Sequence, residues 1–138
     1  MANRNKEKII RLCLHKNKKE NVHEMIIYHP KNYFVRPHMH PKNSESMLIL
    51  KGEIDVIIFN KNGKIKNIIK MGDINSGKPF YYKLQKKTYH TLLIKSNYSI
   101  FFEISEGAFS KNKNYYPKWA PQKKTIQSKK YLKYLLNQ

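Results

Sequence analysis

Cysteine and acidic residues are both scarce in this sequence. Cys13 is the single cysteine, so no disulfide can form within the chain, and nothing in the cysteine content favours an oxidising compartment. Long apolar runs are missing as well. The apolar segment at residues 9–14 is interrupted by Arg11 and is too short for a signal-peptide core or a membrane span. We therefore expect a cytoplasmic protein that does not contact a membrane.

The shortage of acidic residues leaves a large positive charge. The chain has 28 Lys and Arg against 9 Asp and Glu, a formal net charge of +19. Such a positive charge by itself favours binding to nucleic acid, to an acidic membrane surface or to an anionic substrate. Lysine is spread over the whole length together with Asn and Ile, however, which is typical of a compositional bias. The densest basic run, residues 123–133, lies in an expected terminal helix and indicates a solvated face. We therefore do not expect nucleic acid as a partner.

The middle of the chain is expected to be all-β. Short apolar segments alternate there with turn residues, as in a sandwich or barrel, and the 138 residues suit one domain. Asn62-Gly63 provides the chemistry of a tight hairpin turn, and Gly52 predicts a second turn or bulge. The expected strands cover residues 24–29, 33–38, 46–51, 53–59, 64–70, 80–84, 90–94 and 98–104.

The two ends of the chain are expected to pack on this barrel as parts of the same domain. Residues 1–23 form an N-terminal segment, residues 24–105 the barrel, and residues 106–138 an arm followed by a short helix. Thr125 or Ser128 can cap that helix, which is expected to end near Leu136. Segments 47–50 and 56–59 are apolar on both faces, so the terminal segments or a second subunit must cover an outer face. We favour a homodimer.

Three residues in one short stretch point to a metal site. His38 and His40 are two apart, and in an extended strand such residues project from the same face, so two imidazoles can reach one ion. Pro41 ends the strand, and Glu45 starts the next one, where its carboxylate can return to the same point. Alone the histidine pair is a weak signal, but the added Glu45 and Gly52 make the pattern specific.

This pattern resembles the first motif of the cupins, G(X)5HXH(X)3-4E(X)6G, with Asn32 in place of the leading glycine. The resemblance implies a jelly-roll β-barrel in which a second motif supplies another histidine, and His90 is similar in position. The surrounding residues depart from the family pattern: Gln85-Lys86-Lys87 stands where the family has PxG, and Ile94 where it has Asn. The expected ligands of one divalent ion are then His38, His40, Glu45 and His90.

A more specific resemblance extends over nearly the whole chain. The sequence is similar to the WbuC-type cupin-fold metalloproteins, which are associated with gene clusters for O-antigen and other surface polysaccharides. The resemblance implies a sugar or sugar-nucleotide substrate. Three imidazoles and a carboxylate suit Fe, Mn, Zn, Ni, Co or Cu, which could act as a Lewis acid. A non-enzymatic, small-molecule-binding or regulatory cupin is the alternative. The residues that carry the resemblance are Arg11-Leu12-Cys13-Leu14-His15, Met25, Pro37 to Pro41, Glu45, Phe102-Glu103 and Trp119-Ala120-Pro121.

Four further residues are candidates for the substrate pocket. Glu103 stands among apolar residues, where burial would raise its pKa and suit it to acid or base catalysis; a solvent-facing edge position or a salt bridge is the alternative. Arg36 lies two residues before His38 and can bind an anionic, sugar-like ligand. His15 is expected to approach the metal, with a surface histidine as the alternative, and the aromatic ring of Tyr82 to line the cavity, with a place in the core or an interface as the alternative. His23 and His29 are interpreted as structural.

Overall fold

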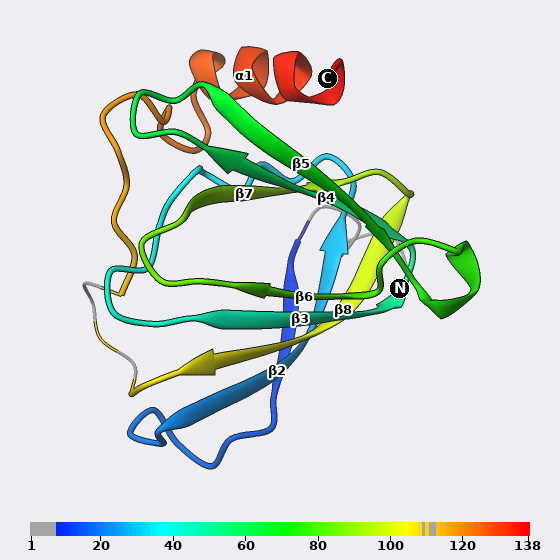
Figure 1. Ribbon diagram of the computed structural model, residues 1–138, viewed down its shortest axis with the longest axis vertical. Helices are drawn as coiled ribbons and strands as arrows, with labels where there is room; N and C mark the ends of the chain where they lie inside the picture. Colours follow the sequence, from blue (N-terminus) through cyan, green and yellow to red (C-terminus); the bar gives the residue numbers. More distant parts are fainter. Residues whose placement is uncertain (1–7, 109, 111–112) are drawn as a thin grey trace.

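Two antiparallel sheets face each other in the computed structural model, which describes residues 8–108, 110 and 113–138 (Figure 1). The larger sheet has five strands in the order β1-β2-β8-β3-β6, and the smaller has three in the order β5-β4-β7. Their bounds are Ile10–Cys13 for β1, Val22–Pro30 for β2, Glu45–Lys51 for β3, Glu53–Phe59 for β4, Ile65–Gly72 for β5, Tyr81–Leu84 for β6, Tyr89–Ile94 for β7 and Tyr98–Glu106 for β8; a short 3₁₀ turn, η1, covers Ile74–Ser76 and the helix α1 covers Ile126–Leu136.

The all-β fold is confirmed, and every expected strand is present except residues 33–38, where the prediction is wrong. Pro37 lacks the amide that a ladder needs, and the carbonyl of Val35 accepts the Thr91 hydroxyl at 2.5 Å instead of a strand amide. Within the N-terminal segment, β1 pairs with β2. The described strands form two separate sheets and not one closed ring, because the outer strands of each sheet pair on one side only.

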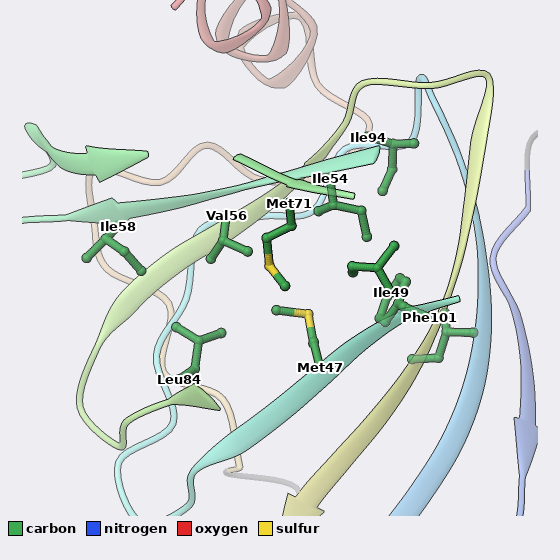
Figure 2. Packing of buried hydrophobic residues seen from close by; sticks show 10 residues of the cluster. Met47, Ile49, Ile54, Val56, Ile58, Met71, Leu84, Ile94 and Phe101 are labelled. Atoms are coloured by element: carbon green, nitrogen blue, oxygen red, sulfur yellow. The ribbon is translucent and has the colours of Figure 1, made fainter. Parts of the chain in front are cut away.

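The main core fills the space between the sheets (Figure 2). Met47 and Met71 come from opposite sheets and point toward one another, and both are almost fully buried. This packing follows from the alternation of β-strand side chains, which turns every second residue of each sheet inward. The other fully buried members are Ile27, Ile49, Ile54, Val56, Ile58, Leu84, Ile94 and Phe101.

The helix α1 covers the outer face of the smaller sheet (Figure 1). Leu135, 1 % exposed, packs against Ile57 and Phe59 of β4 and Leu93 of β7. This contact explains why β4 is apolar on both faces. Thr125 caps the helix, as expected, since its hydroxyl accepts the Ser128 amide at 3.0 Å. Of the helices in the described residues, none is long and apolar enough to cross a bilayer.

The outer face of the larger sheet carries an apolar row that crosses all five strands. The strand registers align Leu12, Ile26, Phe102, Leu48 and Tyr81 side by side, so these residues share one face. Leu12 and Tyr81 remain 58 % and 53 % exposed, and the three between them are partly exposed. We call this row, by its five residues, the outer apolar row. It is a surface on which another molecule could pack.

The two glycine turns form as expected. Gly63 has φ +86°, and the Asn60–Lys64 hairpin closes by a 2.8 Å bond from the Asn60 amide to the Lys64 carbonyl. Gly52 has φ +85° and lies where the chain crosses from β3 in one sheet to β4 in the other. A Cβ atom at this position would lie 2.5 Å from the Tyr98 carbonyl oxygen, so only glycine fits without displacement.

Candidate metal centre

A short extended segment carries the histidine pair. His38 pairs with His90, the second residue of β7, through two backbone hydrogen bonds of 3.0 and 2.9 Å. On its other side Met39 pairs with Tyr115 of the arm, by bonds of 3.0 and 2.8 Å. The segment is therefore held between β7 and the arm, although it is not part of either sheet. Pairing with β7 brings His90 beside the histidine pair from a distant part of the chain.

The four predicted ligands converge at one point. One ring nitrogen from each of His38, His40 and His90 lies within 4.8 Å of the others. Glu45, the first residue of β3, places Oε2 3.0 Å from Nε2 of His40 and 3.7 Å from Nε2 of His90. Residues from three separate segments thus present two classes of donor, imidazole and carboxylate, around a common centre.

The backbone fixes the orientation of all three imidazoles. The Nδ1 atoms of His38, His40 and His90 lie 2.8, 3.3 and 2.9 Å from the carbonyl oxygens of Arg36, Lys113 and Thr88. A carbonyl can only accept a hydrogen bond, so each Nδ1 carries the proton and donates. Each Nε2 is then left with its lone pair for a metal. Such a contact on the far side of the ring is characteristic of metal-binding histidines.

The electrostatics hold most of these groups in the ligand form. Burial lowers the pKa of His38 to about 3 and also lowers the pKa of His90. Burial tends to raise the pKa of Glu45, but the hydrogen bond with His40 and the charges of the three histidines have a larger, opposite effect and lower this pKa to about 2. Burial lowers the pKa of His40, yet Glu45 shifts the net value upward. The result is an ionised carboxylate beside two neutral imidazoles, those of His38 and His90, whereas the contact with Glu45 favours the protonated form of His40.

The donor set fits a divalent transition metal. Among the described residues, the buried Nε2 of His40 has no partner apart from its 3.0 Å contact with the Glu45 carboxylate, so a cation bound by both atoms would satisfy both. Three imidazoles and one carboxylate suit Mn, Fe, Co, Ni, Cu or Zn. Four protein ligands leave one or two positions open if the ion is five- or six-coordinate, which would allow a substrate to bind.

The centre opens into a cavity of about 530 Å³ between the larger sheet and the arm. Its wall includes all four candidate ligands and the apolar residues Met25, Ile27 and Leu92. The charged groups are unevenly divided. The basic residues on the wall are Arg11, Lys18, Arg36, Lys113 and Lys123, whereas the acidic ones are Glu45 and Glu103. A cavity of this kind suits an anionic small molecule.

Glu103 also lines this cavity. It lies on β8, which has partners on both sides, so the alternative of an edge-strand glutamate is wrong. Burial, with the negative charge of Glu45, raises the pKa of Glu103 to about 8. The cavity thus contains two carboxyl groups in opposite states at neutral pH: Glu45 ionised, and Glu103 protonated and able to donate a proton.

The three pocket candidates lie in different surroundings. His15 lines the cavity and stacks on His23, with ring centroids 4.2 Å apart. Arg36 lines it as well, but Nε and Nη2 donate to the Ala120 carbonyl at 3.2 and 3.0 Å, so these donors hold the arm. Tyr82 packs against the core beside Met47 and is not part of the cavity wall, which corrects its expected position.

Sequence reasoning missed the contribution of the arm. The carbonyl of Lys113 anchors His40, and the ring of Tyr116 lies 5.9 Å from that of His38 and 4.7 Å from the Arg36 guanidinium. No motif identifies these residues. Their only signal is the aromatic content of the arm, which indicates packing and not a role at a metal. His23 and His29, interpreted as structural, both line the cavity.

Comparison with known proteins supports the fold. The chain matches, at 15% identity and a TM-score of 0.58, a Klebsiella pneumoniae protein with a double-stranded β-helix domain, covering 83% of this chain and 82% of that one. It also matches oxalate decarboxylase of Bacillus subtilis, at 16% identity and a TM-score of 0.60 over 80% of this chain. It spans only 28% of that enzyme. At these identities the likeness establishes the cupin-type, double-stranded β-helix fold alone.

Sequence comparisons place the chain in a family. No curated protein matches it. Residues 1–71, which contain three of the four candidate ligands and slightly more than half of the chain, match the model of a domain of unknown function, DUF6016. The chain therefore belongs to the DUF6016 family and has the cupin fold.

Proposed function

We propose that the protein is a metal-dependent enzyme that acts on a sugar or sugar-nucleotide intermediate of surface polysaccharide synthesis. The observation that carries the proposal is the convergence of His38, His40, His90 and Glu45 at the wall of a basic cavity. A buried donor set of this kind is costly unless a cation satisfies it. A metal bound there would act as a Lewis acid toward a carbonyl or hydroxyl oxygen.

The residues of the chain would supply the rest of the chemistry. Glu103, with its raised pKa, holds a proton at neutral pH and can donate it to a substrate oxygen in the cavity. The basic wall would bind the phosphate or carboxylate of the substrate. The arm closes one side of the cavity and excludes water from the centre.

The finer likeness to the WbuC-type proteins supports the polysaccharide assignment. Arg11, Cys13 and His15, which belong to the resembling residues, lie with the metal ligands and Glu103 on the wall of the same cavity. Residues that are far apart in sequence and yet meet at one site fit a shared function better than a shared scaffold. We also infer a reducing, cytoplasmic setting, in which Cys13 stays a free thiol.

A non-enzymatic, small-molecule-binding or regulatory cupin is the alternative function. The same cavity and the same ion would then hold a ligand without converting it. A mass-spectrometric screen of sugar nucleotides against the metal-loaded protein separates the two functions. New products support the enzyme, whereas saturable binding without product under every metal supports the alternative.

The metal site itself is tested by elemental analysis of protein purified without added metal. We expect about one equivalent of a divalent transition metal, and its loss in His38→Ala. His15→Ala is the matched control, because His15 lines the cavity outside the ligand set. Full metal content in His38→Ala would refute the site.

We further propose that the protein is a homodimer whose copies meet at the outer apolar row. The row crosses a sheet of five strands, about 24 Å wide at 4.8 Å per strand, and partly exposed apolar neighbours such as Ile10 and Tyr28 widen it. Contiguous exposed apolar side chains of this kind form the centre of many homodimer interfaces. A second copy is the occupant that matches the row, because none of its five side chains is charged and two such rows can pack together without burying a charge.

Light scattering coupled to size exclusion tests the dimer. Phe102 lies at the centre of the row, and Phe102→Asp is expected to give a monomer with an unchanged circular dichroism spectrum. Ile126→Asp, at a 71 % exposed helix position outside the row, is the control and should leave the dimer intact. A monomeric native protein would refute the proposal.

We infer, finally, that residues 1–23, 24–105 and 106–138 are parts of a single folding unit, of which residues 1–7, 109 and 111–112 lie outside the described residues. The pairing of β1 with β2 and the packing of α1 on β4 and β7 support this organisation. Urea denaturation followed by tryptophan fluorescence and by circular dichroism should then give coincident transitions. Separate transitions would contradict it.

A further inference from the structure

A second cluster of nitrogen donors lies on the cavity wall beyond the metal ligands. The rings of His15 and His23 stack face to face, with centroids 4.2 Å apart and planes 4° apart. Nδ1 of His15 donates to the Glu24 carbonyl at 3.1 Å, which leaves its Nε2 on the other side of the ring. His23 is only 4 % exposed, and within the described part of the chain its Nε2 has no hydrogen-bond partner. A buried polar atom of this kind calls for a partner.

The strand registers place this cluster beside the metal centre. His23 of β2 pairs with Ser105 of β8, and Ser105 pairs with Glu45 of β3, so the three share one row across the sheet. His23 and the ligand Glu45 are thus two strand spacings apart, about 10 Å between Cα atoms. A small molecule can span that distance.

Lys113 lies above the middle of this row. Its ammonium nitrogen is 2.7 Å from Oγ of Ser105, between the cluster and the metal ligands. The serine oxygen takes one of the three ammonium hydrogens, and no carboxylate lies within ion-pair distance of Lys113 in the residues described. The remaining ammonium hydrogens are available to a ligand in the cavity, which Lys113 lines.

We propose that His23 and Lys113, with the His15 ring stacked against that of His23, form a subsite for the oxyanion, a phosphate ester or a carboxylate, of a molecule whose other end reaches the metal centre. The ammonium of Lys113 would donate to one anion oxygen, and the imidazole of His23, taking up a proton from solvent as the anion binds, would donate Nε2–H to another. This subsite rests on the proposed function, because its ligand is the substrate of the metal centre. That substrate would be an anionic compound whose metal-binding oxygen lies a few bonds from the anionic group. The excess of basic residues on the wall favours the same class.

The subsite is tested apart from the metal by titrating inorganic phosphate into chelator-treated protein and measuring its dissociation constant by calorimetry. We expect saturable binding that Lys113→Met and His23→Gln each weaken by at least about tenfold. Lys118→Met is the matched control, since it removes the same charge from an exposed position of the same arm. Glucose 6-phosphate and glucuronate, titrated into the metal-loaded protein, distinguish the phosphate ester from the carboxylate.

The outcomes separate this inference from the proposed function. Phosphate binding that Lys118→Met weakens as much as Lys113→Met would show general attraction to a basic surface and overturn the subsite. If the purified protein contains metal but its chelator-treated form binds no phosphate, the subsite is overturned and the metal centre is unaffected. Phosphate binding sensitive to Lys113→Met in a protein that takes up no metal would support the subsite and refute the proposed function.

Discussion

Replacing Glu103 by glutamine should remove a pH dependence from the stability of the protein. The pKa of this carboxyl is raised from its ordinary value of 4.5 to about 8, because the cavity wall buries it near Glu45. Between these two values the folded protein holds a proton that the unfolded chain releases. The contribution of Glu103 to the free energy of unfolding is therefore complete below pH 4.5 and is lost as the pH rises through 8.

The size of the effect follows from the shift. At about 1.4 kcal/mol for each pKa unit, the full loss is at most about 5 kcal/mol, and solvation of the carboxyl by the open cavity reduces it. The assay is urea denaturation of chelator-treated protein at several values between pH 5 and 9. Relative to Glu103→Gln, the native protein should become less stable up to about pH 8 and then change no further.

An exposed glutamate on the same strand provides the control. Glu106 accepts the Ser44 amide at 3.0 Å, and this bond lowers the pKa of its carboxyl, so it stays ionised through the whole range. Glu106→Gln should therefore show the same pH dependence as the native protein. If the curves of native protein and Glu103→Gln ran parallel from pH 5 to 9, Glu103 would not hold a proton at neutral pH. Its assignment as a proton donor would then fail.

Two further predictions concern the scaffold. Leu135→Ala should lower the free energy of unfolding by about 2–5 kcal/mol, because it leaves a cavity against Phe59. Ile126→Ala, at a 71 % exposed position, should change it little. Urea denaturation measures both variants, and equal effects would contradict the packing of α1. Gly52→Ala places a side chain at a positive φ and against a backbone carbonyl, whereas Gly77→Ala has a positive φ but open space around it. Thermal denaturation should therefore show a larger decrease in melting temperature for Gly52→Ala. The reverse order would contradict the geometry of the crossing from β3 to β4.

The part of the site that local sequence determines was predictable. His38 and His40 share a face because alternate residues of an extended chain do so, and Glu45 returns after a turn that Pro41 begins. The strand expected at residues 33–38 does not form, yet the alternation from His38 to His40 holds in a short segment that two isolated bridges fix. His90 could be predicted only from its resemblance to a second cupin motif, since nothing in its neighbours specifies a ligand.

The remaining residues were not predictable because long-range pairing places them. His23 reaches the site through the register of β2 with β8, and Lys113 through an arm that no periodic pattern describes. The expected position of Tyr82 failed for a related reason. Its strand was predicted, but the ring packs against the core cluster and is not part of the cavity wall.

The arm connects the two halves of the site through one residue. The carbonyl of Lys113 holds the His40 ring, while its ammonium lies over Ser105 in the anion subsite. Tyr115, two residues on, pairs with Met39 and fixes the segment between the two histidines.

Tyr115→Pro removes the amide that donates to Met39 at 2.8 Å, so it should lower metal content and phosphate affinity together. Lys113→Met keeps the main chain and should lower phosphate affinity alone. Elemental analysis and calorimetry on the two variants measure both quantities, and a loss of metal in Lys113→Met equal to that in Tyr115→Pro would mean that the side chain, and not the backbone, supports His40.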